Sequence, residues 1–373
     1  MAGEKLETTK RCARFLVDRL APTDRLALIT YDDVVELRAP LAPVDQQALG
    51  RVIDGIHSGG QTNLSGGWLK ATEVLRGATG DGPRKVLLLT DGLANVGIVD
   101  AAHLASMAGQ AAEQDVGTTT IGFGDGFDED LLTRMADAGR GNAHFAATPD
   151  DAPGIFAQEF EGLLSLVAQN VSVEIRPTQA VQVLGILNEY PQVPVEGGVQ
   201  VQLGDAYADE RRRVVFRLHV PRVASLGVAK VADVVIRYAS VGEQVALHEV
   251  TVPMHVNLVS ADEAAAAGPD AEVTEEVVVL ESARAQEQAI ERADAGDFDG
   301  AREVLNEAAE RLRKLAPGSS RADELIERAE RLGEHEVHMF SASYSPEARK
   351  EVWYDRHATR RGRPRKRHPK DQL

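Results

Sequence analysis

An aspartate directly after an apolar run is the first residue whose position suggests a chemistry. Residues Val86 to Thr90 read VLLLT, and Asp91 and Gly92 begin the polar turn DGLANVG. An apolar run of this length is typical of a strand buried on both faces, as in a parallel sheet covered by helices. Open α/β folds bind ligands at the carboxyl edge of such a sheet. We therefore expect Asp91 to lie at the ligand-binding edge of the first domain.

A second polar segment precedes this strand. Residues 58–65 read SGGQTNLS, a Gly-rich loop that carries the hydroxyl of Thr62 and runs into a helical pattern. The two segments occur in the order SGGQTNLSGGW and then LLTDGLANVG. In this order they resemble the von Willebrand factor type A domain, and the resemblance extends over about residues 1–167.

The resemblance implies a metal-ion-dependent adhesion site. In that family a threonine loop and an aspartate after a central strand contribute to the site, which places Thr62 as a metal ligand and Asp91 as a direct or water-mediated ligand. Gly60, Asn63 and Gly92 would support the two loops. The implied ion is Mg²⁺ or Mn²⁺, and Mg²⁺ prefers hard oxygen ligands in octahedral geometry.

The function implied by the resemblance is protein–protein interaction without catalysis, with a carboxylate from the partner completing the metal coordination. The sequence contains no P-loop, no G-x-S-x-G motif and no recognisable Cys–His pairing. Two alternatives remain open. The chain could be a DNA-associated adaptor that uses its basic tail, or a scaffold that has lost its metal site.

The beginning of the chain departs from the family. The third metal element of the family is a D-x-S-x-S run at the end of the first strand, whereas this chain opens with MAGEKLE, which resembles the segment directly after that run. The first strand is central in this fold, so its two neighbours would lose a pairing partner, and unpaired buried backbone groups are costly. We interpret the sequence as truncated at its start through a mis-assigned initiator Met. As written, it should bind metal weakly or not at all.

Composition limits the other possibilities. The formal net charge of the 373 residues is -17, which argues against general nucleic-acid binding by the main body. The single cysteine, Cys12, excludes an internal disulfide framework and fits a reducing compartment. No apolar run is long enough to cross a membrane, and the sequence shows no signal peptide. These features predict a cytoplasmic protein.

The first domain, residues 1–167, is expected to be a doubly wound α/β domain with a mostly parallel sheet. Asp32 and Asp33 lie between two short strand patterns, where a hairpin turn is a commoner reason for adjacent Asp than an acidic site. The sequence GFGDG, residues 122–126, lacks full dinucleotide-loop spacing and indicates a strand-end turn. Helices are predicted over about 4–20, 44–56, 65–76, 100–114 and 153–167, with a further short helix capped by Asp128, and strands are predicted at 25–31, 34–38, 86–90, 117–124 and 142–146.

Four further regions complete the chain. Residues 168–259 alternate apolar and polar residues between turns, which predicts an antiparallel β-sandwich. In bacterial proteins that resemble this one, a sandwich often follows the type A domain, and LGDAYADERRRVVFRLHVP resembles that companion segment. Residues 260–273 form an Ala-rich acidic linker. Residues 274–338 return to a helical period and predict a helical hairpin, and residues 339–373 form a basic, disordered tail.

Two short motifs lie near the end of the chain. Residues 335–338 read HEVH, which is not the H-E-x-x-H zinc spacing and predicts surface histidines near a helix end. Residues 360–370 read RRGRPRKRHPK, and the R-G-R-P core resembles an AT-hook, whose arginines enter the minor groove of A·T-rich DNA. Under that interpretation the DNA contacts come from Arg361, Arg363, Arg365 and Lys366. The alternative is a solvated tail that contacts acidic surfaces.

Overall fold

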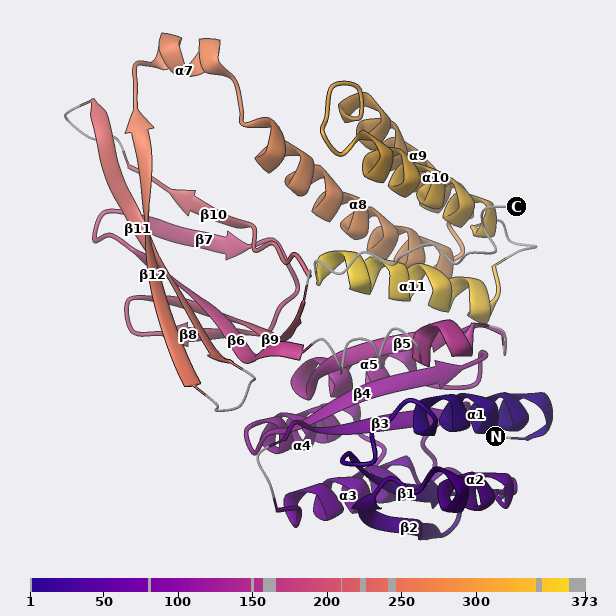
Figure 1. The fold of residues 1–373 in the computed structure, drawn as a ribbon. Coiled ribbons are helices and arrows are strands. Elements are labelled where there is room, and N and C mark those ends of the chain that lie inside the picture. The colour runs from indigo at the N-terminus through magenta and orange to yellow at the C-terminus, as the bar shows by residue number, and fades with distance from the viewer. Residues whose placement is uncertain are drawn as a thin grey trace. The chain divides into compact units, whose positions relative to one another are not determined.

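The computed structural model describes residues 2–79, 82–148, 151–156, 166–208, 210–221, 226–240, 246–339 and 344–361 (Figure 1). The chain divides into two compact units, Met1–Leu166 and Val167–Leu373. No helix in the described ranges is both long and apolar enough to cross a membrane.

The first unit alternates helices with strands, as the sequence predicts, and strands β3, β4 and β5 pair in that order as a parallel sheet. Strand β4 is the central strand of this sheet, because it pairs with β3 on one edge and with β5 on the other. Seven of its eight residues are buried. The elements are α1 (Gly3–Val17), β1 (Arg25–Tyr31), β2 (Val35–Pro43), α2 (Gln46–Asp54), α3 (Leu64–Arg76), β3 (Arg84–Thr90), α4 (Ala101–Ala112), β4 (Val116–Phe123), α5 (Glu129–Ala138) and β5 (Arg140–Ala146). The predicted closing helix over 153–167 lies largely outside the described residues.

Polar side chains on one face of β4 fix the strand to two helices. Trp68 of α3 is 1% exposed, and its indole nitrogen donates a 3.0 Å hydrogen bond to the hydroxyl of Thr118. Two residues farther along the same face of β4, the hydroxyl of Thr120 donates to the carbonyl of Leu132 in α5 at 3.0 Å. Buried hydroxyls are costly when unpaired, so these contacts hold both helices in register with the sheet.

The sheet of the first unit is divided. Strands β1 and β2 form their own antiparallel pair, and within the described residues no ladder joins them to β3. Although β1 reads RLALITY, none of its residues is buried. The hydroxyl of Tyr31, at the end of β1, donates a 2.5 Å hydrogen bond to the carbonyl of Leu89 in β3. Tyr31 therefore provides a side-chain link between β1 and β3.

Two helices hold the divided sheet together. Helix α3 contacts β1, β2 and β3. Helix α1 contributes Cys12 to a buried cluster with Ile121 of β4, and it contributes Val17 to a second cluster that contacts Leu28 of β1. Packing by α1 and α3 therefore links the pair of β1 and β2 to the parallel sheet.

The second unit begins with antiparallel strands, as predicted. A five-stranded sheet has the order β12-β11-β6-β9-β8, and β7 and β10 form a two-stranded antiparallel ribbon. Ile186 of β7 packs against a sheet cluster of Val173, Tyr190, Val201 and Leu203. The strands are β6 (Leu166–Pro177), β7 (Gln182–Ile186), β8 (Gln192–Val195), β9 (Gly198–Tyr207), β10 (Phe216–His219), β11 (Gly227–Ser240) and β12 (Ala246–Leu258).

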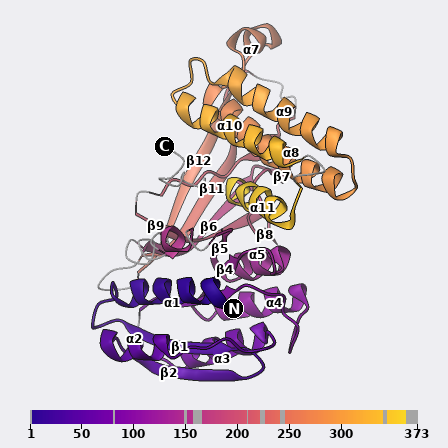
Figure 2. The same ribbon diagram turned by 90° about the vertical axis from the view of Figure 1, so that its right-hand side faces the viewer.

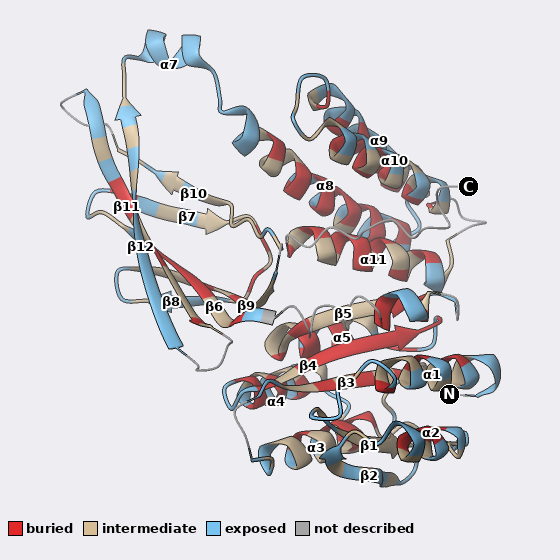
Figure 3. Cartoon of the chain, viewed as in Figure 1, coloured by how far each residue is buried: buried red, intermediate tan, exposed pale blue. Residues whose placement is uncertain are grey.

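The helices of the second unit differ from the prediction at two places. The described helices are α7 (Ala261–Ala267), α8 (Ala271–Asp294), α9 (Phe298–Leu315), α10 (Ala322–His338) and α11 (Pro346–Arg360). Helix α7 occupies part of the predicted linker and is exposed throughout (Figure 3). Helix α11 lies within the predicted disordered tail and packs against α8 and α10 (Figure 2).

Local sequence explains why α11 forms despite its basic composition. The Ser345 side chain caps the backbone N–H of Ala348, and Pro346 lies in the first turn, both of which favour a helix start. Val352 is fully buried in the apolar cluster shared by α8, α9 and α10. Tertiary packing therefore orders a segment whose charge alone predicted disorder.

The expectation of surface histidines was wrong for His335. This side chain is 2% exposed, and its Nδ1 lies 3.0 Å from Nε2 of Gln286 in α8. The same Gln286 nitrogen donates to Asp355 of α11 at 2.7 Å. Burial lowers the pKa of His335, although the charge of Asp355 opposes this shift. His335 therefore belongs to the packing between α8, α10 and α11.

The second unit should lose stability in mild acid because of His335. Its folded-state pKa lies below the ordinary value of 6.5, so the unfolded chain binds the proton more readily. The contribution is present above pH 6.5 and is lost as pH falls below it. Hydrogen exchange of α10 amides, corrected for intrinsic rates, should quicken between about pH 7.5 and about pH 5.5. A His335→Gln variant should show a smaller change, and an equal change would contradict this assignment.

Candidate functional site

Asp91 lies where the sequence analysis places it, directly after β3 at the carboxyl edge of the parallel sheet. The residue is partly exposed. The hydroxyl of Thr90 donates to the carbonyl of Gly92 at 3.1 Å, which tightens the turn on both sides of Asp91. The end of a buried strand therefore presents a carboxylate on a short, internally bonded turn.

Thr62 is brought to the same edge by Asn95. The backbone N–H of Thr62 donates to Oδ1 of Asn95 at 2.8 Å, and the N–H of Asn95 donates back to the carbonyl of Thr62 at 3.2 Å. A Cβ added at Gly92 would lie 3.4 Å from Oγ1 of Thr62. The structure thus brings together the two residues that the resemblance singles out, and it adds Asn95, which the sequence analysis missed.

Asn63 connects the threonine loop to the helix behind it. Its side chain accepts a 2.9 Å hydrogen bond from the N–H of Gly66 and is the N-cap of α3. In the next turn, the hydroxyl of Ser65 accepts a hydrogen bond from the N–H of Ile98 at 2.9 Å. The loop that carries Thr62 is therefore fixed to both α3 and the segment after Asp91.

Asp32 and Asp33 do more than form the turn between β1 and β2. The carboxylate of Asp33 accepts from the N–H of Gln61 at 2.9 Å, and the carbonyl of Asp32 accepts from the N–H of Asn63 at 3.1 Å. A Cβ at Gly59 would collide with the carboxylate of Asp32, so only glycine fits there. Both aspartates thus hold the threonine loop, a role that adjacent Asp in a turn pattern did not reveal.

The predicted strand-end turn over residues 122–126 lies at the carboxyl end of β4, beside the Asp91 turn. Gly124 has φ +67°, and a Cβ there would also meet the ammonium of Lys5. A Cβ at Gly126 would lie 2.6 Å from the carbonyl oxygen of Asp91. The backbone after β4 therefore approaches the Asp91 turn so closely that a side chain at Gly126 is excluded.

Tyr31 lies at the end of β1 with its phenol hydroxyl bonded to the carbonyl of Leu89, near the end of β3 before Asp91. Burial raises the pKa of its phenol, the charge of Asp91 raises it further, and a hydrogen bond with Thr90 opposes both. The phenol consequently stays neutral at physiological pH and keeps donating to Leu89. A neutral donor at this position links β1 to β3 without adding charge beside Asp91.

The described donors do not make a complete metal site. Among these residues no group of three or more His, Cys, Asp or Glu side chains is placed to hold a metal ion. Thr62 and Asp91 supply two of the three elements that the resemblance requires, and the D-x-S-x-S run is absent from the sequence. A cation held by one hydroxyl and one carboxylate would depend on water for most of its ligands.

Of the candidate DNA-contact residues, Arg361 lies within the described residues. The guanidinium of Arg361 lies 5.2 Å from the centroid of the Tyr190 ring, and Arg361 is 4% exposed. Its carbonyl accepts a 2.5 Å hydrogen bond from the Tyr190 hydroxyl. Arg363, Arg365 and Lys366 lie outside the described residues. Arg361, the first arginine of the R-G-R-P core, is therefore packed against the protein rather than presented to solvent.

Comparison with known protein families agrees with this geometry. Residues 1–158 match the family model of the von Willebrand factor type A domain. This part of the chain is a type A domain. Thr62, Asn95 and Asp91 all lie within the matched residues.

Sequence similarity to other proteins extends beyond the type A domain. The chain is 26% identical over 327 residues to the uncharacterized protein sll0103 of Synechocystis, covering 83% of this chain and 75% of the relative. It is 28% identical over 225 residues to the uncharacterized protein YfbK of Escherichia coli, covering 58% of this chain but only 39% of YfbK. It is also 28% identical over 239 residues to a protein of Arabidopsis thaliana named E3 ubiquitin-protein ligase WAV3, of which it spans 30%.

Solved structures share the fold over most of the chain. A von Willebrand factor type A protein from Catenulispora acidiphila matches with a TM-score of 0.71 at 14% identity, over 98% of this chain and 86% of the other. The ArnB paralog VWA2 from Sulfolobus acidocaldarius matches with a TM-score of 0.54 at 19% identity, over 93% of this chain and 82% of the other. At these identities the likeness concerns the fold alone.

Removing the Asn95 side chain should loosen the threonine loop. An Asn95→Ala variant loses the acceptor for the Thr62 amide, which is an exposed hydrogen bond worth about 0.5–1 kcal/mol. Hydrogen exchange of the Thr62 amide should quicken while exchange in β4 stays unchanged. Gln61→Ala, a substitution in the same loop, is the control and should leave Thr62 exchange unaltered. Unchanged Thr62 exchange in Asn95→Ala would refute the linking role of Asn95.

Proposed function

We propose that this chain is a non-enzymatic protein–protein interaction module whose type A domain contacts its partner at the edge that carries Thr62 and Asp91. The observation that supports this proposal most directly is the two-way hydrogen bonding between Thr62 and Asn95. It brings a hydroxyl and a carboxylate, from separate segments of the chain, to one partly exposed edge. Loops positioned on a rigid sheet are common binding sites.

The partner we propose presents an acidic residue. In the type A family a divalent cation bridges the domain to a partner carboxylate. Here Thr62 would offer its hydroxyl and Asp91 its carboxylate, while Asn95, Asn63 and Asp33 fix the loops that carry them. Mg²⁺ or Mn²⁺, when bound, would supply the positive charge that attracts the partner's carboxylate.

Metal-assisted binding needs a further element at this edge. In the type A family the D-x-S-x-S run ends a central strand, and among the described residues of this chain no ladder joins β1 to β3. A strand inserted there would pair with the facing edges of β1 and β3 and could bring the absent oxygen ligands to Thr62 and Asp91. We therefore expect the strand and the metal affinity to be restored together.

An engineered extension tests this expectation. When a strand ending in D-x-S-x-S is joined before Met1, calorimetry should detect binding of Mg²⁺ or Mn²⁺, and Asp91→Ala in that extended chain should abolish it. Asp45→Ala removes the same charge at the N-cap of α2 and should leave metal binding intact. Metal binding by Asp91→Ala with the affinity of the extended parent would show that the site lies elsewhere.

An assay of partner capture distinguishes metal-assisted binding from binding by a scaffold without a metal site. Thr62→Ala in the extended chain should weaken partner capture in Mg²⁺ with little effect on folding, because this hydroxyl lies on a partly exposed loop. A chelator should reduce capture by the extended parent to the level of Thr62→Ala or below. Capture that ignores both the chelator and the substitution would favour a scaffold without a metal site.

A further inference from the structure

Helix α11 is attached to its neighbours by a different kind of contact from helix α9 of the same unit. The buried residues of α9 are all apolar, namely Ala301, Leu305, Ala308, Ala309 and Leu312. Four of the seven buried residues of α11 are polar or charged, namely Lys350, Asp355, Arg356 and Thr359. The contact of α9 is thus apolar, whereas the contact of α11 combines apolar packing at Val352 with polar and charged pairing.

The ion pairs between α8 and α11 are in register. Nε of Arg349 lies 3.1 Å from Asp294, and one guanidinium nitrogen of Arg356 lies 2.5 Å from Glu287. Each pair of residues is seven apart on its own helix, and residue numbers rise on one helix as they fall on the other. Two antiparallel helices therefore present matching charges at a spacing of about two turns.

An aromatic anchor lies between the two arginines of α11. The Trp353 ring centroid is 5.8 Å from the guanidinium carbon of Arg349 and 5.0 Å from that of Arg356. Trp353 also packs against the apolar cluster that contains Val352. Tryptophan and arginine are the residues that most often dominate the energy of protein interfaces.

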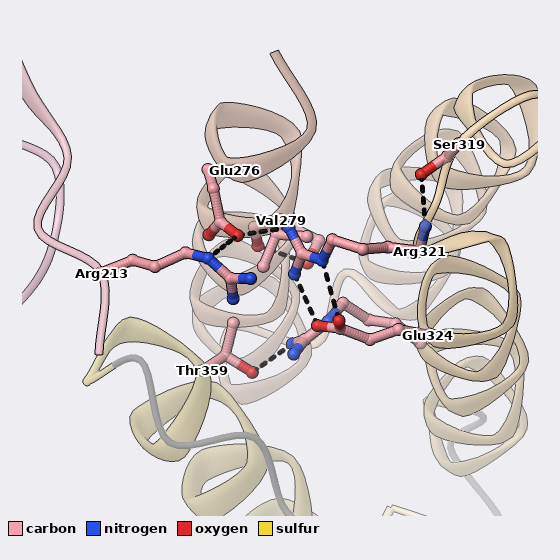
Figure 4. A network of polar contacts seen from close by, with 9 residues as sticks. Arg213, Glu276, Val279, Ser319, Arg321, Glu324 and Thr359 are labelled. Carbon is pink, nitrogen blue, oxygen red and sulfur yellow. Dashed lines mark hydrogen bonds and ion pairs between the residues drawn. The ribbon is translucent and has the colours of Figure 1, made fainter. Parts of the chain in front are cut away.

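The far end of α11 joins a larger polar network (Figure 4). The hydroxyl of Thr359 accepts a 2.6 Å hydrogen bond from buried Arg328 of α10. Beyond it, Glu276 of α8 contacts both Arg213, at 2.9 Å, and Arg321. Arg328 of α10 thus connects Thr359 of α11 to the side of the network that lies on α10.

The pairing under α11 is incomplete. Within the described part of the chain, Nε of Arg328, Arg356 and Arg360 and Nε1 of Trp353 are buried without a hydrogen-bond partner. Buried donors without acceptors, and buried charges in general, reduce the net gain from docking. The contact of α11 therefore gains less free energy than its number of ion pairs suggests, which favours exchange over permanent attachment.

We propose that α8 and α10 form a binding surface for a basic helix, and that α11 is its exchangeable resident ligand. The recognised ligand is a helix with two arginines seven residues apart and a tryptophan between them, as in Arg349, Trp353 and Arg356. Asp294 and Glu287 of α8 pair with the arginines, Glu189 between β7 and β8 shares Arg356, and the cluster around Val352 receives the tryptophan. This surface is independent of the function proposed for the type A domain.

Tethering explains why α11 occupies the surface in the intact chain. A ligand on the same chain acts at an effective concentration in the millimolar range, so it outcompetes a free helix of equal intrinsic affinity. Weakening α11 alone should open the surface to a helix added in trans.

The test uses the full chain and a fluorescent peptide of residues 346–360. Fluorescence anisotropy should show at least about tenfold tighter peptide binding to an Arg349→Glu, Arg356→Glu double variant than to the parent, because charge reversal removes the resident helix. A peptide with the same two substitutions should bind neither protein. Arg302→Glu on α9 is the matched control, since its side chain is 31% exposed against 29% for Arg349, and it should behave as the parent.

Hydrogen exchange shows whether α11 detaches on its own or unfolds together with α9. In the double variant, or in Arg349→Glu alone if the double variant does not fold, α11 amides should lose protection while α9 amides keep theirs. Loss of protection in both helices would show that α11 is part of one cooperative core and would overturn the proposal. Equal peptide binding to parent and variant, or none to a variant whose α9 stays protected, would overturn it as well.

Discussion

Backbone pairing between β3, β4 and β5 is the interaction on which the first unit depends. The parallel ladder aligns the carboxyl ends of β3 and β4, so that the Asp91 turn and the turn after Phe123 meet at one edge. Among the described residues, the same kind of pairing is missing between β1 and β3, where Tyr31 and the packing of α1 and α3 form the connection. A sheet joined through side chains leaves some of its strands partly exposed, as the burial pattern of β1 shows.

The candidate site is built mainly from backbone groups that surrounding side chains hold in place. Asn95, Asp33 and Asn63 each accept a hydrogen bond from a main-chain N–H in or next to the threonine loop. Glycines allow these segments to approach, most clearly at Gly126 beside the carbonyl of Asp91. Such an arrangement fixes the positions of a few oxygen atoms at this edge of the sheet.

In the second unit, helices are packed by apolar contacts and, at α11, also by ion pairs. The packing of α8, α9 and α10 rests on an apolar cluster that includes Leu305, Leu312 and Leu325, and such burial gains free energy from every apolar side chain. The packing of α11 adds arginines and carboxylates that must first lose water. The contrast separates a structural helix from one that resembles a bound ligand, although both belong to the same compact unit.

The sequence by itself determined the fold class, the alternation of helices and strands, the antiparallel strands and the position of Asp91, because hydrophobic period and turn residues act locally. Motif order gave Thr62, but nothing local pointed to Asn95 or to the loop contacts of Asp32 and Asp33, which join segments far apart in the chain. The burial of His335 and the ordering of α11 were also decided by tertiary structure. In both cases, charged or polar residues that favour solvent in isolation find their partners only when distant helices come together.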